Sequence, residues 1–334
     1  MDSDKRLNPW PIIGHEWAVR QLQVAVARGD VSHALLITGP ASVGKYTLAL
    51  TLAKAMLCEA ETETRPCGIC AVCRRVDSGN HTDLFLATPE EEGRGVKIEQ
   101  IRELERFLSL TPNESAYKIA IITDFEKANP NAANALLKTL EEPPQYAHLI
   151  LLASDADTLL PTIVSRSQHL PLRPLDVHTV EQGLIASWNV APPQAQRLAR
   201  LSGGRMGWAV QAITQSDHLQ QMEEALQTMI TLLRSDLPTR FETAGKIAEN
   251  PTRLPQTLEY WRACWRDVLL LQTQSAEGLT YQEYHEELQG IARSTSVDAT
   301  AHTLRALGDA QLALGSNANT RLLVETLLLD LPEL

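Results

Sequence analysis

The sequence predicts an α/β domain built on a parallel sheet, followed by a long region that is entirely helical. Three observations support this prediction. Short apolar runs alternate with helical patterns as far as residue 172, which is the arrangement of a parallel sheet covered by helices. One of these runs leads directly into a glycine-rich loop. Beyond residue 172 only helical patterns remain, so we expect the architecture to change there.

Three apolar runs predict the strands of the sheet: 34–38, 117–124 and 148–155. They have the continuous apolar character of strands that are buried on both faces. A helical pattern follows the first run at 47–58. Between the other two, NPNAANALLKTLEEPP (129–144) predicts a helix. Pro143 and Pro144 end it, because proline disfavours the helical conformation in the residue before it.

The remainder of the chain is predicted to be a linker followed by helices. PLRPL at 171–175 has the composition of a linker. Helical patterns then cover 177–188, 192–200, 206–213, 217–234, 239–249, 253–273, 281–293, 297–314 and 319–330. We expect three domains on this basis: an α/β domain at 1–173, a small helical domain at 174–213 and a helical domain at 214–334.

Composition narrows the functional classes. The chain has 334 residues, 44% of them hydrophobic, and a net charge of −11. This charge argues against a protein that grips nucleic acid unaided, because neutralising phosphates requires clustered Lys and Arg. No apolar run is long enough to cross a membrane, and the N-terminus lacks the apolar core of a secretory signal. We therefore expect a cytoplasmic protein, in which cysteines bind metal more often than they form disulfides.

Four cysteines form the pattern C-x8-C-x2-C-x2-C: Cys58, Cys67, Cys70 and Cys73. Two overlapping CxxC turns can converge on one tetrahedral Zn²⁺, with Cys58 completing the shell. Four sulfur ligands leave no position for a catalytic water, so the predicted zinc is structural. The alternative is four unrelated buried cysteines. Cys264 lies in an aromatic helical stretch and is expected to be a core residue.

The glycine-rich loop reads GPASVGKYT at 39–47. Gly39, Gly44 and Lys45 have the spacing of a phosphate-binding loop, whose amides cradle phosphates while the lysine reaches the β and γ groups. The next residue should be Ser or Thr, because its hydroxyl holds Mg²⁺. It is Tyr46, whose phenol is too long and too bulky, and Thr47 is one position too late.

A second catalytic group is also replaced. A phosphate-loop ATPase needs an acidic residue at a distant strand end for Mg²⁺ and a group that positions the attacking water. IITDFEK supplies Asp124 at the end of a predicted strand, but Phe125 follows where the water-orienting Glu is expected. Glu126 is displaced by one position. Together the two replacements indicate a degenerate site, and whether it binds ATP stays open.

Four features occur in one order: residues 12–40, the cysteine insert, residues 117–144 and LPTIVSRS at 160–167. This order resembles the AAA+ subunits of the bacterial DNA polymerase III sliding-clamp loader. The resemblance covers about residues 1–213, and NTRLLVETLLLDL at 319–331 is similar to the family's last collar helix. It implies an AAA+ domain, a small helical lid domain and a helical collar domain for oligomerisation.

The resembling family contains an ATP-hydrolysing motor subunit and a delta-prime type whose ATP site has often decayed. Tyr46 and Phe125 fit the delta-prime type. A third departure agrees with them: motor subunits carry an Arg that senses the γ-phosphate, and in SGGRMGWAV that place falls on Gly207. Arg205 is two residues out of register.

One motif of the family is intact, in Ser165-Arg166-Ser167. The family's Ser-Arg-Cys motif offers its Arg to ATP on the neighbouring subunit, and here Ser167 replaces the Cys. The resemblance therefore implies that Arg166 is an arginine finger acting in trans. The alternative is an exposed Arg that pairs with a carboxylate of its own chain.

The resemblance also implies partners: motor (tau/gamma) and delta subunits in a hetero-pentamer, and the sliding clamp and primer-template DNA through that complex, with no membrane. Two alternatives stay open. One is an active ATPase of the same fold, with Thr47 or water replacing the missing hydroxyl. The other is a zinc-containing nucleic-acid-binding module with Arg65, Arg74 and Arg75 near the cysteines, although aromatic residues for base stacking are absent there.

Overall fold

The structure is a computed structural model that describes residues 10–89, 96–215, 217–275, 278–314 and 319–334. Its contacts divide the chain into two compact units. One runs up to Gly183 and includes Gly204–Gly207. The other contains Leu184–Gly203 and Trp208–Leu334. The three-domain division at 173 and 213 stays a prediction.

The first unit is built on a five-stranded parallel sheet with the order β2-β3-β4-β1-β5. The strands are β1 (Ala34–Thr38), β2 (Leu84–Ala87), β3 (Lys118–Ile122), β4 (Ala147–Ala153) and β5 (Gln168–Pro171). β1, β3 and β4 are buried along their whole length, which confirms the three strands predicted from apolar runs. Because all strands are parallel, their carboxyl ends meet at one edge.

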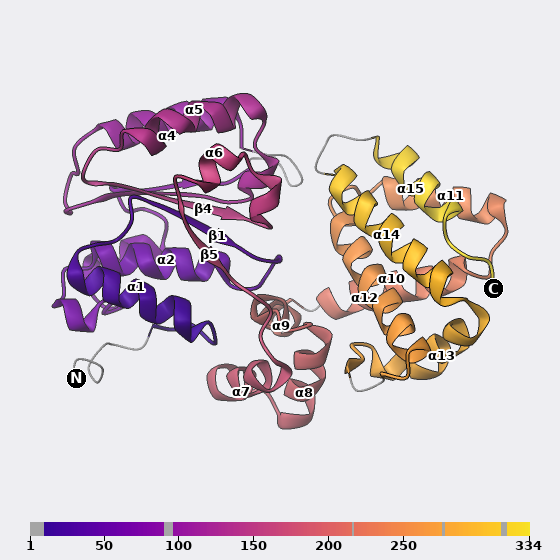
Figure 1. The fold of residues 1–334 in the computed structure, drawn as a ribbon. Helices are drawn as coiled ribbons and strands as arrows, with labels where there is room; N and C mark the ends of the chain where they lie inside the picture. The colour runs from indigo at the N-terminus through magenta and orange to yellow at the C-terminus, as the bar shows by residue number, and fades with distance from the viewer. Residues whose placement is uncertain (1–9, 90–95, 216, 276–277, 315–318) are drawn as a thin grey trace. The chain divides into compact units, whose positions relative to one another are not determined.

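Helices cover both faces of this sheet (Figure 1). α1 (Glu16–Arg28) and α2 (Lys45–Leu57) lie on one face, and α4 (Ile98–Ser109) and α5 (Pro130–Glu141) lie on the other. Successive strand residues point to opposite faces. Ile37 and Ile121 therefore pack beneath α2, and Leu36 and Ile122 pack beneath α5, in two separate cores. The predicted α/β architecture is confirmed.

Two strands have no clear signal in the sequence. β2 has only four residues, and two of them are half-buried. β5 is an edge strand in which Leu170 alone is buried, so it shows no apolar run. Pro171 begins the predicted linker but is the last residue of β5 and pairs with Thr38. Proline is tolerated there because an edge strand has one unpaired side.

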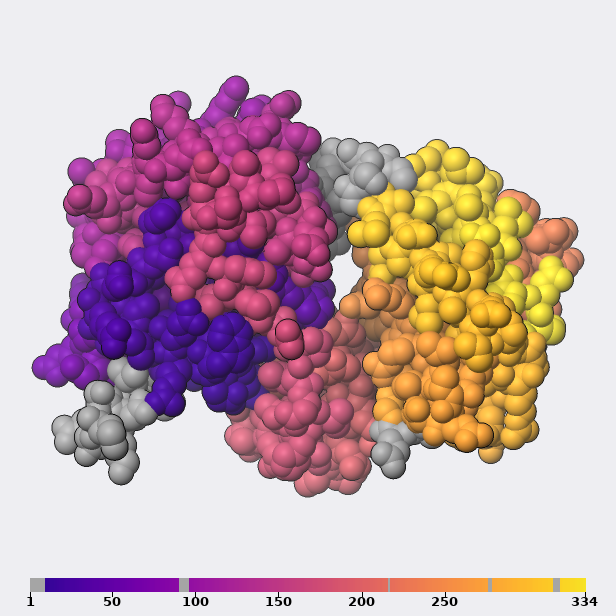
Figure 2. All heavy atoms as spheres, in the orientation of Figure 1, coloured from indigo at the N-terminus to yellow at the C-terminus, as the bar shows by residue number. Residues whose placement is uncertain are grey.

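Beyond Pro171 the described residues contain no strand, as predicted. The helices are α7 (Val177–Trp188), α8 (Pro192–Leu201), α9 (Met206–Thr214), α10 (His218–Leu232), α11 (Leu237–Ala248), α12 (Leu254–Gln272), α13 (His285–Ser294), α14 (Val297–Leu314) and α15 (Thr320–Leu329). α13 and α14 form much of the visible face of the second unit (Figure 2). None of the described helices is long and apolar enough to cross a membrane.

A buried arginine fixes the C-terminal helix. Arg240 on α11 is 2% exposed. Its guanidinium donates to the carbonyls of Leu328, Leu331 and Pro332 at 2.8–3.0 Å. The last carbonyls of a helix have no partner within it, and a cation there also matches the helix dipole. Cys264 is buried on α12, as predicted for a core residue.

Candidate functional site

The glycine-rich loop joins β1 to α2, which is the setting that a phosphate loop requires. Gly39 has a φ of 146°, and a Cβ there would lie 2.4 Å from the carbonyl oxygen of Leu172. Gly44 has a φ of 113° and caps α2. The Gly39 amide donates to the carbonyls of Ala153 and Ser154 after β4. These contacts hold the loop at the carboxyl edge of the sheet.

Lys45 is turned back onto its own loop. Its ammonium donates to the carbonyl of Gly39 and, at 2.9 Å, to that of Pro40. In a working phosphate loop this ammonium pairs with the β and γ phosphates of the nucleotide. Phosphate binding would therefore have to replace two hydrogen bonds that the loop already makes.

The two residues after Lys45 both lie at the surface. Tyr46 is 42% exposed, and Thr47 is exposed as well. Asp124 follows β3 in a left-handed conformation, with its carboxylate half exposed and 3.7 Å from the ammonium of Lys127. β1 and β3 are separated by β4, so Asp124 and the loop share an edge of the sheet without being neighbours in it. The candidate metal ligand thus has a cation beside it.

Phe125 belongs to the core. Its ring is 2% exposed and packs in the cluster beneath α5. Glu126 is the next residue in the short 3-10 turn Phe125–Lys127, and its Oε2 is buried without a hydrogen-bond partner. The position where the sequence predicts a water-orienting acid therefore holds a core side chain, and the neighbouring acid is partly buried.

Two further residues hold the loop. The sequence singles out Gly207 only as the place of a missing Arg, and it contains no signal for His15. His15 has a left-handed φ of 56° and is buried, and its Nε2 donates to the Val43 carbonyl at 3.2 Å. The Gly207 amide donates to the Ser42 carbonyl at 2.8 Å. A Cβ at residue 207 would lie 2.7 Å from that oxygen. Gly207 therefore lies directly against the loop, where no side chain fits without a shift.

Arg166 lies on the surface just after α6 (Pro161–Val164). Its guanidinium NH2 lies 2.7 Å from Oε1 of Glu141, and its NH1 donates to the Thr162 carbonyl at 3.1 Å. The turn itself is fixed, because Ile163 is fully buried and the Ser167 hydroxyl donates to its carbonyl at 2.9 Å. The two side chains of the ion pair are 36% and 52% exposed. Arg166 thus makes the pairing with a carboxylate of its own chain that was the alternative to a finger, and it does so at the surface of a fixed turn.

The four cysteines of the insert converge, with all sulfur atoms within 4.8 Å of one another. Cys58 and Cys70 are 4.0 Å apart, and Cys67 and Cys73 are 3.9 Å apart. A tetrahedral zinc with bonds of about 2.3 Å places its sulfurs about 3.8 Å apart. The donor set and spacing fit zinc.

The surroundings of the sulfurs shift the pKa values of these thiols in different directions. Burial raises the pKa of Cys58 and of Cys73, whereas the amides of Ile69 and Cys70 lower the pKa of Cys67 to about 6. A buried thiolate is costly without a positive charge beside it, and a coordinated metal deprotonates thiols outright. The amides aimed at the sulfurs are typical of the outer shell that orients metal ligands.

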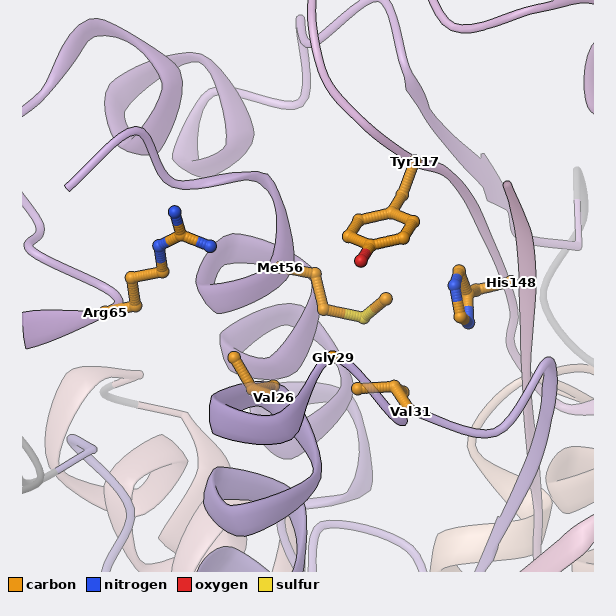
Figure 3. Close-up of a pocket in the computed structure, with 7 residues that line it drawn as sticks. All are labelled: Val26, Gly29, Val31, Met56, Arg65, Tyr117 and His148. Atoms are coloured by element: carbon orange, nitrogen blue, oxygen red, sulfur yellow. The ribbon is translucent and has the colours of Figure 1, made fainter. Parts of the chain in front are cut away.

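A small hollow lies at the opposite edge of the sheet, where the strands begin (Figure 3). It has a volume of about 30 Å³ and is lined by Val26, Gly29, Val31, Met56, Arg65, Tyr117 and His148. The His148 Nδ1 donates to the Ser32 carbonyl, and the rings of Tyr117 and His148 meet edge to face. Ligand sites for drug-sized molecules occupy about 300 Å³ or more. This hollow is therefore no nucleotide site.

Comparison with known proteins identifies relatives along nearly the whole chain. A family model described as DNA polymerase III, delta subunit, matches residues 14–176. The chain is 31% identical to DNA polymerase III subunit delta' of Bacillus subtilis over 94% of this chain and 95% of that protein. It is also 31% identical to subunit delta' of Pseudomonas aeruginosa, over 91% and 92%.

Proteins named as tau or gamma subunits are also similar to this chain. Subunit tau of Escherichia coli is 32% identical over 67% of this chain and 36% of that protein. Among solved structures, a DNA polymerase III gamma subunit-related protein from Thermotoga maritima is 20% identical. That match covers 92% of this chain and 97% of the other, with a TM-score of 0.45.

Proposed function

Because the chain belongs to the delta-prime family of DNA polymerase III subunits, we propose that it is a sliding-clamp-loader subunit that does not hydrolyse ATP itself. One observation carries the proposal. The loop has the shape of a phosphate loop, but the Lys45 ammonium donates to the Pro40 carbonyl and the Gly207 amide donates to the Ser42 carbonyl, both within that loop. Tyr46 and Phe125 support it, since each replaces a group that ATP hydrolysis needs.

Arg166 is the group that such a subunit contributes to its neighbour. Its planar guanidinium matches phosphate oxygens in two places at once, and its charge is permanent. A finger of this kind is worth about three to five orders of magnitude in hydrolysis rate. The exposure of Arg166 on a fixed turn supports this role. The same chain then lacks ATP chemistry of its own and completes the site of an adjacent motor subunit.

The partners in this proposal are ATP-hydrolysing subunits of the tau/gamma type and a delta subunit, together in a hetero-pentamer. Relatives named tau and gamma support the first of these. The sliding clamp and primer-template DNA are engaged through the whole complex, because a net charge of −11 does not suit unaided DNA binding. The proposed location is the cytoplasm.

The proposed cofactor is one structural zinc held by Cys58, Cys67, Cys70 and Cys73. Bound there, zinc would supply a cross-link that fixes the loop between α2 and α3 (Ala71–Asp77). The proposed domains are the AAA+ domain at 1–173, the lid domain at 174–213 and the collar domain at 214–334.

The test is Arg166→Ala in a loader assembled with active motor subunits. We expect unchanged assembly and a fall of at least about 100-fold in the ATP turnover that depends on this interface. Arg102→Ala is the matched control, since Arg102 is an exposed arginine on α4 of the same unit. Normal turnover in the Arg166→Ala loader would remove the finger from the proposal.

A second candidate is an active ATPase of the same fold. The retained Gly39, Gly44 and Lys45 favour it, since these residues are the part of the site that binds phosphate. Turnover by the isolated chain that Lys45→Ala abolishes would select this candidate.

A further inference from the structure

We propose that Glu141 is a positioning residue for Arg166: its carboxylate orients the guanidinium for the ATP of a neighbouring subunit. The proposal rests on the finger role proposed above and adds a residue to it. The observation behind it is the 2.7 Å contact between the Arg166 NH2 and the Glu141 Oε1. Nothing in the sequence pairs these residues, which are 25 positions apart.

Both side chains of the pair extend from fixed elements. Glu141 is the last residue of α5, whose start is capped by the Asn129 side chain at 2.8 Å from the Ala132 amide. Leu136 and Leu140 of this helix are buried in the core. Arg166 follows α6, which Ile163 anchors in the same core. Because both helices are anchored in the same core, the backbones of Glu141 and Arg166 are fixed relative to each other.

Two acceptors fix the plane of the guanidinium. Glu141 binds NH2, and the Thr162 carbonyl binds NH1 at 3.1 Å, so the group is held at two of its nitrogens. An arginine side chain has many rotamers, and ordering it costs binding energy. A side chain that is ordered before the phosphate arrives loses less freedom when it engages. This is the advantage that Glu141 gives to Arg166.

The size of the effect follows from exposure. The two side chains are 36% and 52% exposed, so water and salt screen the pair, and exposed ion pairs are weak. We therefore expect a loss of about three- to fivefold in turnover without Glu141, which is far below the loss expected without Arg166 itself. Higher salt should reduce turnover more in the wild-type loader than in a loader with Glu141→Ala, because only the wild type has the pair to lose.

The test compares Glu141→Ala, Glu141→Asp and Glu142→Ala in the assembled loader. Glu142 is the matched control, because it is the adjacent exposed acid. We expect Glu141→Ala to lower kcat about three- to fivefold with KM for ATP unchanged, since another subunit binds the ATP. Glu141→Asp should recover part of the loss, and Glu142→Ala should equal wild type. An unchanged or raised kcat in Glu141→Ala would overturn the proposal.

A double-mutant cycle separates positioning from a structural role. If Glu141 acts through Arg166, then Glu141→Ala should cause no further loss in a loader that already carries Arg166→Ala. A further loss there would show that Glu141 acts by another route, and would also overturn the proposal. Failure of the underlying finger role is a different result, because Arg166→Ala itself would then leave turnover unchanged.

Discussion

Phe125 occupies a position of the candidate ATP site where a charged side chain would be costly. Its ring is 2% exposed within the core beneath α5. Restoring a carboxylate there would place a charge in an apolar core, which is costly unless the charge is paired. Gly207 adds a second obstacle, since any side chain would meet the Ser42 carbonyl. We therefore expect that replacing Tyr46 by Ser or Thr would not by itself produce ATP hydrolysis.

The replacements at the site could be predicted, but the contacts could not. Tyr46 and Phe125 depart from motifs whose spacing is short, so the sequence alone exposes them. His15 contacts Val43 across 28 positions, and Gly207 contacts Ser42 across 165. Such contacts depend on how distant segments of the chain fold back onto the loop, and no local sequence pattern predicts that.

Asp83 is expected to make the stability of the protein depend on pH. Its carboxylate is fully buried and accepts hydrogen bonds from the amides of Asn113, Glu114 and Ser115 at 2.8–3.1 Å, and from the Ser115 hydroxyl. Burial by itself would raise the pKa of Asp83, but these donors outweigh it, and the pKa is lowered. Because the folded pKa is depressed, the ionised carboxylate stabilises the fold above about pH 4. That stability is lost as the pH falls through the lowered pKa.

Asp83→Asn should destabilise the protein at pH 7 by about 2–4 kcal/mol, because the side-chain amide cannot accept from all of these donors. It should also flatten the dependence of stability on pH below about pH 4. Urea unfolding between pH 3 and pH 7 measures both effects. Asp157→Asn, at an exposed position of the same unit, is the control. An equally steep acid dependence in Asp83→Asn would contradict the assignment.

Secondary-structure elements differ in how much of their signal is local. β4 is seven buried residues in a row, and its apolar run is visible in the sequence. β5 has one buried residue and becomes a strand only because β1 is beside it. The cysteine cluster is easy to recognise for the opposite reason, since all four cysteines fall within residues 58–73. A structure formed by residues close in sequence can be predicted from a local pattern, whereas an edge strand such as β5 depends on the strand beside it.

The proposed zinc site can be tested by the metal content of the protein. Purified protein should contain about one zinc per chain, and the double variant Cys67→Ser, Cys70→Ser should contain almost none, because two of four ligands are lost. Trp10 donates to the Arg65 carbonyl beside the cluster, so its fluorescence should change as the module loosens. Elemental analysis and emission spectra measure these outcomes.

Cys264→Ala is the control for that experiment, because Cys264 is buried on α12 outside the cluster. It should keep its zinc. Full metal content in the double variant would place the metal elsewhere and would leave the four sulfurs as buried cysteines.

For the whole molecule, the sequence predicts a change of architecture but not the division into two compact units. The change from mixed to helical architecture near residue 172 could be predicted, because it is a change of pattern along the chain. The contacts of Gly204–Gly207 with the first unit could not. Leu175 donates its amide to the Gly204 carbonyl at 2.8 Å, and a Cβ at Gly204 would lie 2.2 Å from the Leu175 carbonyl oxygen. The short segment Gly204–Gly207 thus belongs to a unit whose continuous part ends at Gly183.

An asymmetry between two cations tests the proposed function of the whole chain. If the chain contributes a guanidinium but does not hydrolyse ATP, then Lys45→Ala should leave the turnover of an assembled loader within about twofold of wild type. Arg166→Ala should lower the part of that turnover that depends on its interface by at least about 100-fold. Lys45 is the residue that an active phosphate loop cannot lose, since it pairs with the transferred phosphates. The isolated chain should hydrolyse no ATP, whether it is the wild type, Lys45→Ala or Arg166→Ala.

The comparison requires that both variants assemble, which size-exclusion chromatography checks, and that Lys45→Ala folds. Lys45 is half-buried on the loop and donates to the carbonyls of Gly39 and Pro40, outside the two cores of the sheet, so its removal should leave those cores intact. A loader in which Lys45→Ala abolishes part of the turnover, with assembly unchanged, would mean that this chain hydrolyses ATP. The departures at Tyr46 and Phe125 would then need another explanation. Equal, small effects of both substitutions would instead leave the chain as a structural subunit with no finger.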